Sequence, residues 1–573
     1  MNQTRVFLLL AWLMVATLLW MEWSKEQDAA HAPAPVAQGT TTTAPPRTGS
    51  AAIPTAPSNM PAAAPLQNAQ APTAPADAND VVTVTTDTLR LTLDGGAVRS
   101  AELLKYPVEA KGEANVTLFD PSPARFFEAQ SGWVSNTGAA PDHVKGFVPE
   151  GNVRAYALKQ GDATIVVPFT WTGDNGVTIR RTYTLKRGGY AIAVRDDVVN
   201  NGSTPWQGYV YRQLMRNPPP QKTGYTNPEA FAFHGAAWYS PDDKYEKRKY
   251  DDFADGPIAE TPTGEKDVVG GWIALLQHYF FTAWVPNDKD ASRFSISTTQ
   301  ENGVPHYVVR SFGPGVTVAP GARAETSARL WVGPKLVEQI EASNVPGLTR
   351  AVDFSSYATM ATLAGWLFWV LAKIHAVVGN WGWSIIGLVV LIRLLLYPVA
   401  AKQFQSMAKM RKLQPRMQQL KERYGDDRQK LQMATMELYK KEKVNPAAGC
   451  LPVLVQMPIF LALYWMLSES VELRHAPWIG WITNLSARDP YFILPVINVA
   501  IMWATQKLSP MTGMDPTQQK MMQLMPIVIG VTMIFFPAGL VLYWVTNGAL
   551  GLAQQWFMLR RYADKPETLP AKA

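Results

Sequence analysis

Five apolar segments in the last third of this 573-residue chain constrain its fold more than any other feature. They span residues 381–400, 447–467, 491–508, 521–536 and 538–559. In lipid every backbone polar group must be satisfied within the protein, and a segment of about 20 apolar residues achieves this as a helix. We therefore predict that these five segments are membrane-spanning helices.

The first of these segments carries one arginine, Arg393, in its interior. An unpaired charge inside a membrane helix costs between roughly 3 and 10 kcal/mol or more. The four segments that follow contain no interior acid that could neutralise it. Such a charge is kept where it faces a wet cavity, so a polar chamber within the membrane is the first functional hypothesis. The alternative is a structural contact of Arg393 with a lipid headgroup or a backbone carbonyl.

The N-terminal region has a different composition. Residues 1–27 contain Arg5 followed by an apolar run, which predicts a transmembrane anchor; a cleaved signal peptide ending near Ala30-His-Ala32 is the alternative. Residues 28–80 are rich in Ala, Pro and Thr and contain no aromatic residue. A segment of this kind cannot bury a core, so we predict a disordered tether.

Residues 81–345 alternate apolar and polar side chains over many short runs, which is typical of strands. The stretch 177–195 predicts a hairpin that turns at Gly188-Gly189. Many short strands with few helices indicate a β-sandwich. The chain has a single cysteine, Cys450, so this domain must fold without an intrachain disulfide. We find no catalytic or metal-ligand spacing, and we expect no enzymatic activity, metal or cofactor.

Residues 346–379 contain an apolar stretch, 355–378, with Lys373 and His375 near its end. We predict an amphipathic helix lying at the membrane interface, with a full span as the alternative. Counting the N-terminal anchor, the chain then has six transmembrane helices, five of which belong to the segment 380–560.

The charge distribution predicts the topology. Between Lys402 and Lys443 there are twelve Lys/Arg against five Asp/Glu, whereas the loop 468–489 is balanced. Apolar segments flank the basic stretch on both sides, so the positive-inside rule explains it better than nucleic-acid binding does. The tail 561–573 is also basic at its start. We therefore predict that both termini are cytoplasmic and that the β domain lies outside.

The basic stretch 402–445 predicts a cytoplasmic helical hairpin. Apolar residues recur every three to four positions up to Tyr424, Gly425 then marks a turn, and Asp427 is placed to cap a second helix. The hairpin is rich in methionine, which is typical either of a small packed seam or of an adaptable surface for varied apolar segments. These methionines are Met407, Met410, Met417, Met433 and Met436.

Several motifs resemble those of the YidC/Oxa family of membrane insertases. They are Asn380–Ile386, Arg393, Tyr397-Pro398, Lys443–Pro446, Gln456–Tyr464 and Phe536–Tyr543. The anchor, the long β domain and the six-span plan resemble the Gram-negative form of the family. The resemblance covers essentially the whole chain and is strongest over residues 354–560.

This resemblance implies a polytopic α-helical insertase and chaperone in the bacterial inner membrane, with a large periplasmic β-sandwich domain. It would insert, fold and help assemble inner-membrane proteins through a hydrophilic groove, alone or with the Sec translocon. The resemblance implies that Arg393 lies in this groove. Other polar residues of the spans could line it with hydrogen bonds, namely Ser384, Gln456, Asn498, Thr505 and Asn547. For the last three the alternative is hydrogen bonding between helices. The substrate would slide into lipid along the third and last spans, past Ile459, Phe460, Leu463, Tyr543 and Trp544.

The implied partners are nascent inner-membrane proteins, the Sec translocon, the ribosome, the signal recognition particle receptor and the lipid bilayer, with no direct contact to nucleic acid. Two other functions fit parts of the sequence. A secondary transporter would use Arg393 as an anion site, but the spans show no internal repeat. An anchored periplasmic binding module would place the function in the β domain.

Overall fold

The computed structural model describes residues 81–219, 232–253, 266–301, 303–355, 357–398, 400–401, 413–425, 427–442, 451–508 and 516–563. The predicted anchor 1–27 and tether 28–80 lie outside these residues, as do the last ten residues of the predicted tail.

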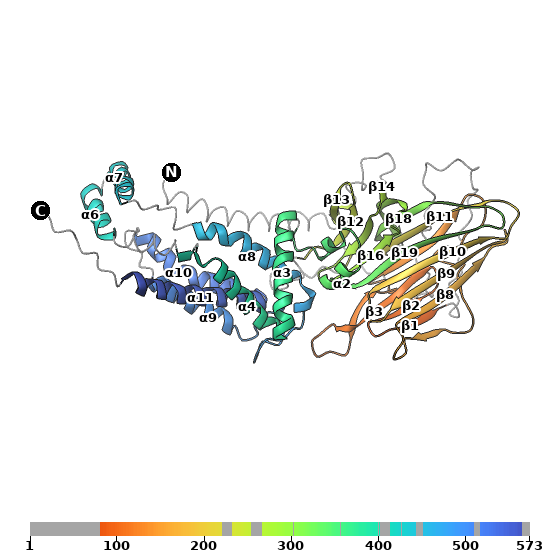
Figure 1. Cartoon of the computed structure of the whole chain (residues 1–573), viewed down its shortest axis with the longest axis horizontal. Helices are drawn as coiled ribbons and strands as arrows, with labels where there is room; N and C mark the ends of the chain where they lie inside the picture. Colours follow the sequence, from red (N-terminus) through yellow and green to blue (C-terminus); the bar gives the residue numbers. More distant parts are fainter. Residues whose placement is uncertain are drawn as a thin grey trace. The chain divides into compact units, whose positions relative to one another are not determined.

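The β domain consists of two sheets (Figure 1). In sheet A the strand order is β14 (Lys266–Val269), β17 (Ala291–Glu301), β18 (Val304–Val318), β11 (Trp206–Arg216), β5 (Phe127–Ser135), β3 (Ala97–Pro107), β2 (Leu89–Leu93), β1 (Val82–Thr85) and β7 (Ala155–Ala157), with β4 (Asn115–Phe119) paired to β3. In sheet B the order is β13 (Lys244–Lys249), β12 (Gly235–Ser240), β15 (Trp272–Leu276), β16 (Phe280–Pro286), β19 (Arg323–Pro334), β10 (Ala191–Asn200), β9 (Val177–Lys186), β8 (Thr164–Thr172) and β6 (Val148–Pro149). The predicted β-rich domain is confirmed.

Strand β9 illustrates why these sequences form strands. Its side chains alternate between buried and more exposed positions along Val177–Lys186, as a sheet with one face on the core requires. The predicted hairpin is present, because β9 pairs antiparallel with β10 and Gly188 in the turn has a φ of 72°. That backbone conformation suits glycine, which has no Cβ to clash. Arg181 occupies a buried position of β9 and is fully covered.

Two rows of polar side chains lie on facing strands in the interior of the β domain. In sheet B the row consists of the cross-strand partners Arg181, Asp196 and Thr326. In sheet A it consists of the partner positions Ser131, Arg212 and Ser311. The rows meet, because Nη2 of Arg212 donates a hydrogen bond of 3.2 Å to Oγ1 of Thr326. The sheets therefore enclose charged groups as well as an apolar core.

Asp196 is the carboxylate at the centre of these rows. Its two oxygens accept hydrogen bonds of 2.7 Å each from Nε and Nη2 of Arg181, and Oδ2 also accepts one from Nε1 of Trp133 at 2.8 Å. Burial lowers the pKa of Arg212 to about 10, and the charge of Asp196 opposes this shift. Asp196 is thus hydrogen-bonded to Arg181 and also stabilises the charge of Arg212, on which Asp290 acts more weakly.

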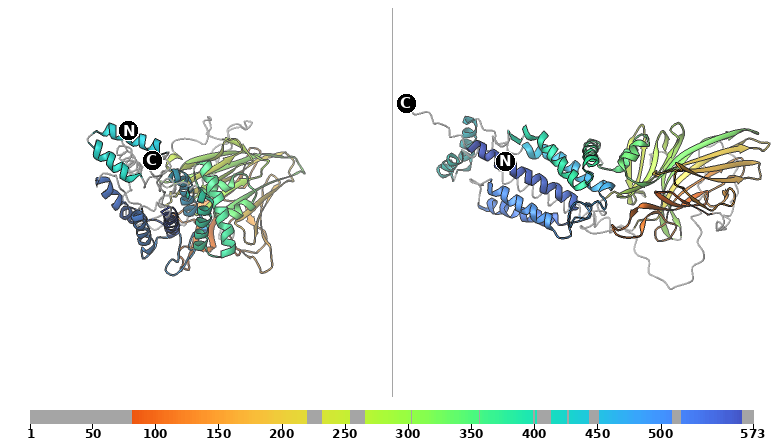
Figure 2. Two further views of the ribbon diagram at one scale, coloured as in Figure 1. Left: turned by 60° about the vertical axis from the view of Figure 1, so that its left-hand side comes forward. Right: turned by 60° about the horizontal axis from the view of Figure 1, so that its bottom comes forward.

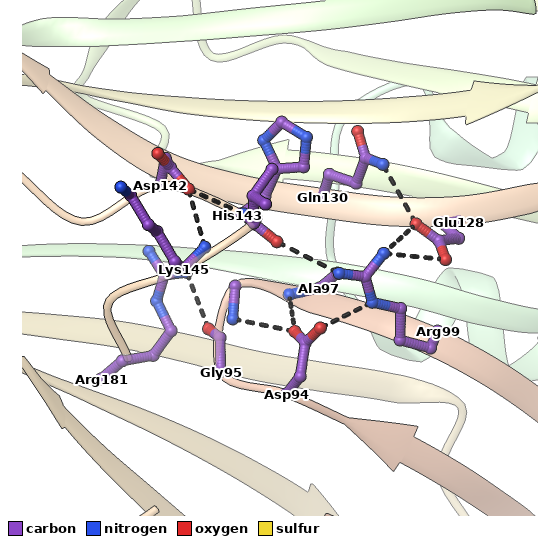
Figure 3. Close-up of polar contacts among 12 residues, drawn as sticks. Asp94, Gly95, Ala97, Arg99, Glu128, Gln130, Asp142, His143, Lys145 and Arg181 are labelled. Atoms are coloured by element: carbon purple, nitrogen blue, oxygen red, sulfur yellow. Dashed lines mark hydrogen bonds and ion pairs between the residues drawn. The ribbon is translucent and has the colours of Figure 1, made fainter. Parts of the chain in front are cut away.

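A second ionic network fixes the turn between β2 and β3 (Figure 3). Oδ1 of Asp94 accepts a hydrogen bond of 2.7 Å from the backbone N–H of Ala97, and Oδ2 accepts one of 2.6 Å from Nε of Arg99. Nη1 of Arg99 donates to both oxygens of Glu128, at 2.8 and 3.0 Å, and Nη2 donates to the carbonyl of His143. The guanidinium group of Arg99 therefore bridges the carboxylates of Asp94 and Glu128, which is typical of a network with a structural role.

The C-terminal part of the chain is helical. Short α2 (Val337–Ala342) and 3-10 helix η4 (Leu348–Val352) lead into it, followed by α3 (Ala358–Val378), α4 (Trp381–Leu395), α6 (Gln414–Tyr424), α7 (Arg428–Lys441), α8 (Leu451–Glu469), α9 (Ile493–Leu508), α10 (Pro516–Met533) and α11 (Ala538–Ala563). Helix α11 packs against α4, α8 and α9. The connection at Pro537 is short, since α10 ends and α11 begins within five residues of each other.

Helix α3 runs across the direction of α4, α8 and α11 (Figures 1 and 2). Its His375 ring stacks on Trp381 at the start of α4, with ring centroids 3.8 Å apart. Trp366 and Trp369 are exposed, whereas Phe368 and Leu371 are buried. The helix therefore has a covered side and a side rich in exposed aromatic rings.

The six-span prediction is not confirmed by helix length and composition. Among the described residues, these two criteria alone qualify one helix to cross a membrane, and it is α3, which we predicted at the interface. Helices α4 and α9 and the stretch Lys520–Met533 are apolar but shorter. Helix α4 ends at Leu395, earlier than the predicted limit at residue 400, and Pro398 follows three residues later. The break is at Leu396, and helical backbone resumes at Tyr397 and Pro398.

Candidate functional site

The candidate site lies between α4 and α11, which pack against each other. Asn380 caps α4, because its side chain accepts a hydrogen bond of 3.1 Å from the backbone N–H of Trp383. Its amide nitrogen also donates to the carbonyls of Pro477 and Trp478. These contacts fix the start of the helix whose last turn carries Arg393.

Arg393 is held by one residue of α11. Its Nε donates a hydrogen bond of 2.9 Å to Oδ1 of Asn547, and its Nη2 donates one of 2.8 Å to the backbone carbonyl of the same residue. Arg393 and Asn547 are both half-buried. The contact brings together two predicted groove residues that lie 154 positions apart in the sequence. It also contains the backbone carbonyl that the alternative interpretation of Arg393 required.

The charge of Arg393 is not neutralised within the described part of the chain. No carboxylate there forms an ion pair with it, and Asn547 is an uncharged acceptor. A guanidinium group stays protonated in proteins, so the site keeps one positive charge. Because it is half-buried among apolar helices, this charge acts on other charges more strongly than it would in water.

Helix α11 presents a second polar residue on the same face. Tyr543, Asn547 and Gly551 are spaced four positions apart, which places them above one another along one side of a helix. The hydroxyl of Tyr543 accepts a hydrogen bond of 3.0 Å from Nε2 of Gln456 on α8. A Cβ atom at Gly551 would lie 3.0 Å from Nη2 of Arg393. Glycine therefore leaves room for the guanidinium; the four-residue spacing contained this signal, but we did not predict the role.

Ser384, which we also predicted in the groove, has a hydrogen-bond partner within its own helix. It is fully buried, and its hydroxyl donates a hydrogen bond of 2.7 Å to the carbonyl of Asn380 in its own helix. Ser384 and Arg393 are nine positions apart, and at about 100° per residue they fall on opposite sides of α4. The structure therefore does not bring these two residues together.

The remaining predicted groove residues are on α9, and their polar groups have local partners. The amide nitrogen of Asn498 donates to the sulfur atoms of Met502 and Met533, at 3.5 and 3.0 Å. The hydroxyl of Thr505 donates to the carbonyl of Ile501. Asn498 is buried and Thr505 is half-buried. Neither residue has a hydrogen bond to Arg393 among the described contacts.

Aromatic side chains of α8, of α11 and of the connection before α11 form a cluster beside this site. Phe460 stacks on Trp544 with ring centroids 5.4 Å apart, and Phe536 meets Trp544 edge-on at the same distance. Of the predicted slide residues, Ile459, Phe460 and Trp544 are half-buried. Leu463 and Tyr543 are only 1% and 2% exposed, so their side chains cannot form an outer surface. Sequence spacing alone did not separate these two buried positions from the partly exposed ones.

The predicted helical hairpin consists of α6 and α7. The predicted cap is confirmed, because the side chain of Asp427 accepts a hydrogen bond of 3.1 Å from the backbone N–H of Lys430. Met433 and Met436 are 62% and 55% exposed, while Met417 is half-buried. Met407 and Met410 lie outside the described residues. Two methionines therefore form an exposed apolar patch on α7.

We also searched for side chains that could bind a metal ion. Among the described residues there is no cluster of three or more His, Cys, Asp and Glu side chains that could hold a metal ion. A charged, half-buried site between apolar helices, together with a large β domain, is typical of a polytopic membrane protein with a polar chamber.

Comparisons with known proteins identify the family. Residues 373–565 match the family described as "60Kd inner membrane protein", and residues 81–370 match the family described as "YidC periplasmic domain". A relative from Xanthomonas euvesicatoria pv. vesicatoria (strain 85-10), called "Membrane protein insertase YidC", is 54% identical over 99% of both chains. One of the same name from Stenotrophomonas maltophilia (strain R551-3) is 54% identical over 99% of this chain and 98% of its own. The chain belongs to the YidC family of membrane protein insertases.

Among solved structures, one described as "Active YidC insertase crystal structure with the first transmembrane domain resolved" covers 83% of this chain and 92% of its own at 18% identity, with a TM-score of 0.36. A score this low leaves the assignment to the sequence relatives. Those relatives are named as insertases and not as enzymes, in agreement with the sequence-based expectation. The β domain is accordingly a periplasmic domain, and the helical part belongs to an inner-membrane protein.

Proposed function

We propose that this protein inserts nascent inner-membrane proteins into the bilayer through a hydrophilic groove whose fixed charge is Arg393. The observation that carries the proposal is the Arg393–Asn547 contact, which holds a positive charge between apolar helices without neutralising it. A substrate would offer the polar, often acidic flank of its apolar segment to this charge. Hydrating the flank partway lowers the barrier to crossing. Burial of the apolar segment is then downhill and requires no fuel.

The proposal includes a topology. Six transmembrane helices, with both termini in the cytoplasm, would place the basic hairpin α6–α7 on the cytoplasmic side, as the positive-inside rule expects. Helix α3 would lie at the periplasmic interface, where its exposed Trp366 and Trp369 suit the headgroup region. The crosswise direction of α3 relative to α4 and α8 supports this placement (Figure 1). The Sec translocon, the ribosome and the signal recognition particle receptor are further proposed partners.

Photocrosslinking from Ile459 tests the proposal. Ile459 is half-buried beside the aromatic cluster, and we expect a probe there to crosslink to the apolar segment of a small inner-membrane protein during its synthesis. The crosslink should disappear when that segment is made polar. A probe at Leu463, one helical turn further and buried, should give no crosslink. Equal crosslinking from both positions, or none from Ile459 in correctly folded protein, would contradict the proposed exit path.

The methionine patch on α7 predicts a role in substrate recruitment. We expect the double substitution Met433→Ser and Met436→Ser to slow insertion by about thirtyfold, since burying each exposed methionine against a substrate contributes on the order of 1 kcal/mol, or about 2 kcal/mol for the pair. The rate of co-translational insertion into vesicles measures this effect. Replacing the exposed neighbours Gln429 and Gln432 with serine is the matched control. An equal loss in the control would point to damage to the hairpin rather than to a lost docking surface.

A further inference from the structure

The Arg393–Asn547 contact also determines which N–H groups of the arginine are used and which way the guanidinium group points. A guanidinium group has five N–H donors. Asn547 accepts from two of its three nitrogen atoms, Nε and Nη2, through one side-chain oxygen and one backbone oxygen. Among the described residues Arg393 makes no further hydrogen bond, so none of them accepts from Nη1. Within this part of the chain Asn547 fixes the direction of the guanidinium group and uses two of its three nitrogen atoms.

The chemical type of the acceptor matters as much as its position. A carboxylate at position 547 would bind the guanidinium with the same geometry and would also cancel its charge. Asparagine has nearly the same shape and carries no charge. The pair therefore keeps the full positive charge of Arg393 while limiting the directions in which it can point.

The surroundings on α11 favour this interpretation over an incidental contact. Gly551 lies one turn beyond Asn547, and any Cβ there would come within 3.0 Å of Nη2. Tyr543 lies one turn before Asn547. Its hydroxyl accepts a hydrogen bond from Gln456, and among the described contacts it has no hydrogen bond with Arg393. One face of α11 thus supplies an acceptor and a space for the same guanidinium group.

We infer that Asn547 is a positioning and specificity-determining residue: it orients Arg393 without neutralising it, and so sets the preference of the groove for acidic substrate segments. This inference rests on the proposed function. Asn547 acts through Arg393 and need not touch the substrate. Its identity, asparagine rather than aspartate, determines the net charge that a substrate meets.

The test uses two model substrates that differ only in having Glu or Gln in the translocated flank. The measured quantity is the ratio of their insertion rates in vesicles that contain the full-length protein. We expect Asn547→Asp to lower the Glu/Gln ratio by about tenfold, because the new carboxylate pairs with Arg393. In an Arg393→Gln background, Asn547→Asp should lower the ratio by much less, since no charge remains to be cancelled.

Asn498→Asp is the matched control, because it makes the same substitution at a buried asparagine of α9 that binds methionine sulfur atoms instead of Arg393. We expect it to slow both substrates alike and to leave the ratio unchanged. A ratio that is unaffected by Asn547→Asp but lowered by Arg393→Gln would overturn the inference and keep the proposed function. A ratio that Arg393→Gln does not change would instead overturn the attraction on which both rest.

Discussion

Replacing Asp196 with asparagine is expected to lower the free energy of unfolding of the β domain by about 3–5 kcal/mol. Asp196 is 2% exposed and is the carboxylate that faces both Arg181 and Arg212 between the sheets. Removing its charge leaves Arg181 without its paired carboxylate and takes from Arg212 the larger of the two carboxylate charges that act on it. The cost of an uncompensated buried charge is large. Urea-dependent resistance of the β domain to proteolysis, in the full-length protein, measures the change.

The next residue on the same strand is the control. Asp197 points to the other side of β10 and pairs with Arg195 at the surface, where the two side chains are 33% and 52% exposed. An exposed ion pair contributes at most about 1 kcal/mol, so Asp197→Asn should have a small effect. If the two substitutions destabilise the domain equally, the contacts of Asp196 with the buried arginines do not contribute the expected stability.

These rows also show how far the sequence could predict the β domain. The alternation along β9 and the glycine turn predicted the hairpin that places Arg181 opposite Asp196. It did not predict that Arg212 would lie across from Thr326, because that contact depends on how two sheets of distant strands face each other. Local periodicity specifies which side chains share a face, and strand order then decides what each face meets.

For the candidate site, too, the sequence predicted some features and not others. The charge of Arg393 and the polarity of Asn547 and Gln456 could be predicted, because polar groups inside apolar segments are unusual. Their partners could not, since the Arg393–Asn547 and Gln456–Tyr543 contacts join helices far apart in the sequence. The position of Ser384 on the opposite side of α4 from Arg393 follows from helical geometry, because the two residues are nine positions apart. Leu463 and Tyr543 are buried by neighbouring helices, which no single segment reveals.

Reversing the charge at position 393 should have the largest effect on function. We expect Arg393→Glu to slow insertion of substrates with acidic translocated segments by at least about tenfold, and of otherwise identical neutral substrates by much less. Two unit charges about 4 Å apart interact by about 4 kcal/mol at an effective dielectric constant of about 20, so attraction becomes repulsion of similar size. Both acceptors of Asn547 would also face a carboxylate instead of a donor.

Lys373→Glu provides the matched charge reversal outside the site. Lys373 lies on α3 with its ammonium group 5.9 Å from the centre of the Trp369 ring, and it has no described contact with Arg393 or Asn547. Insertion rates of the acidic and neutral substrates, measured in vesicles with equal amounts of each variant, decide the result. If Arg393→Glu slows both substrates equally, the arginine supports the structure of the groove and does not attract the substrate. A preference lost only in Arg393→Glu, and kept in Lys373→Glu, assigns the attraction to the charge between α4 and α11.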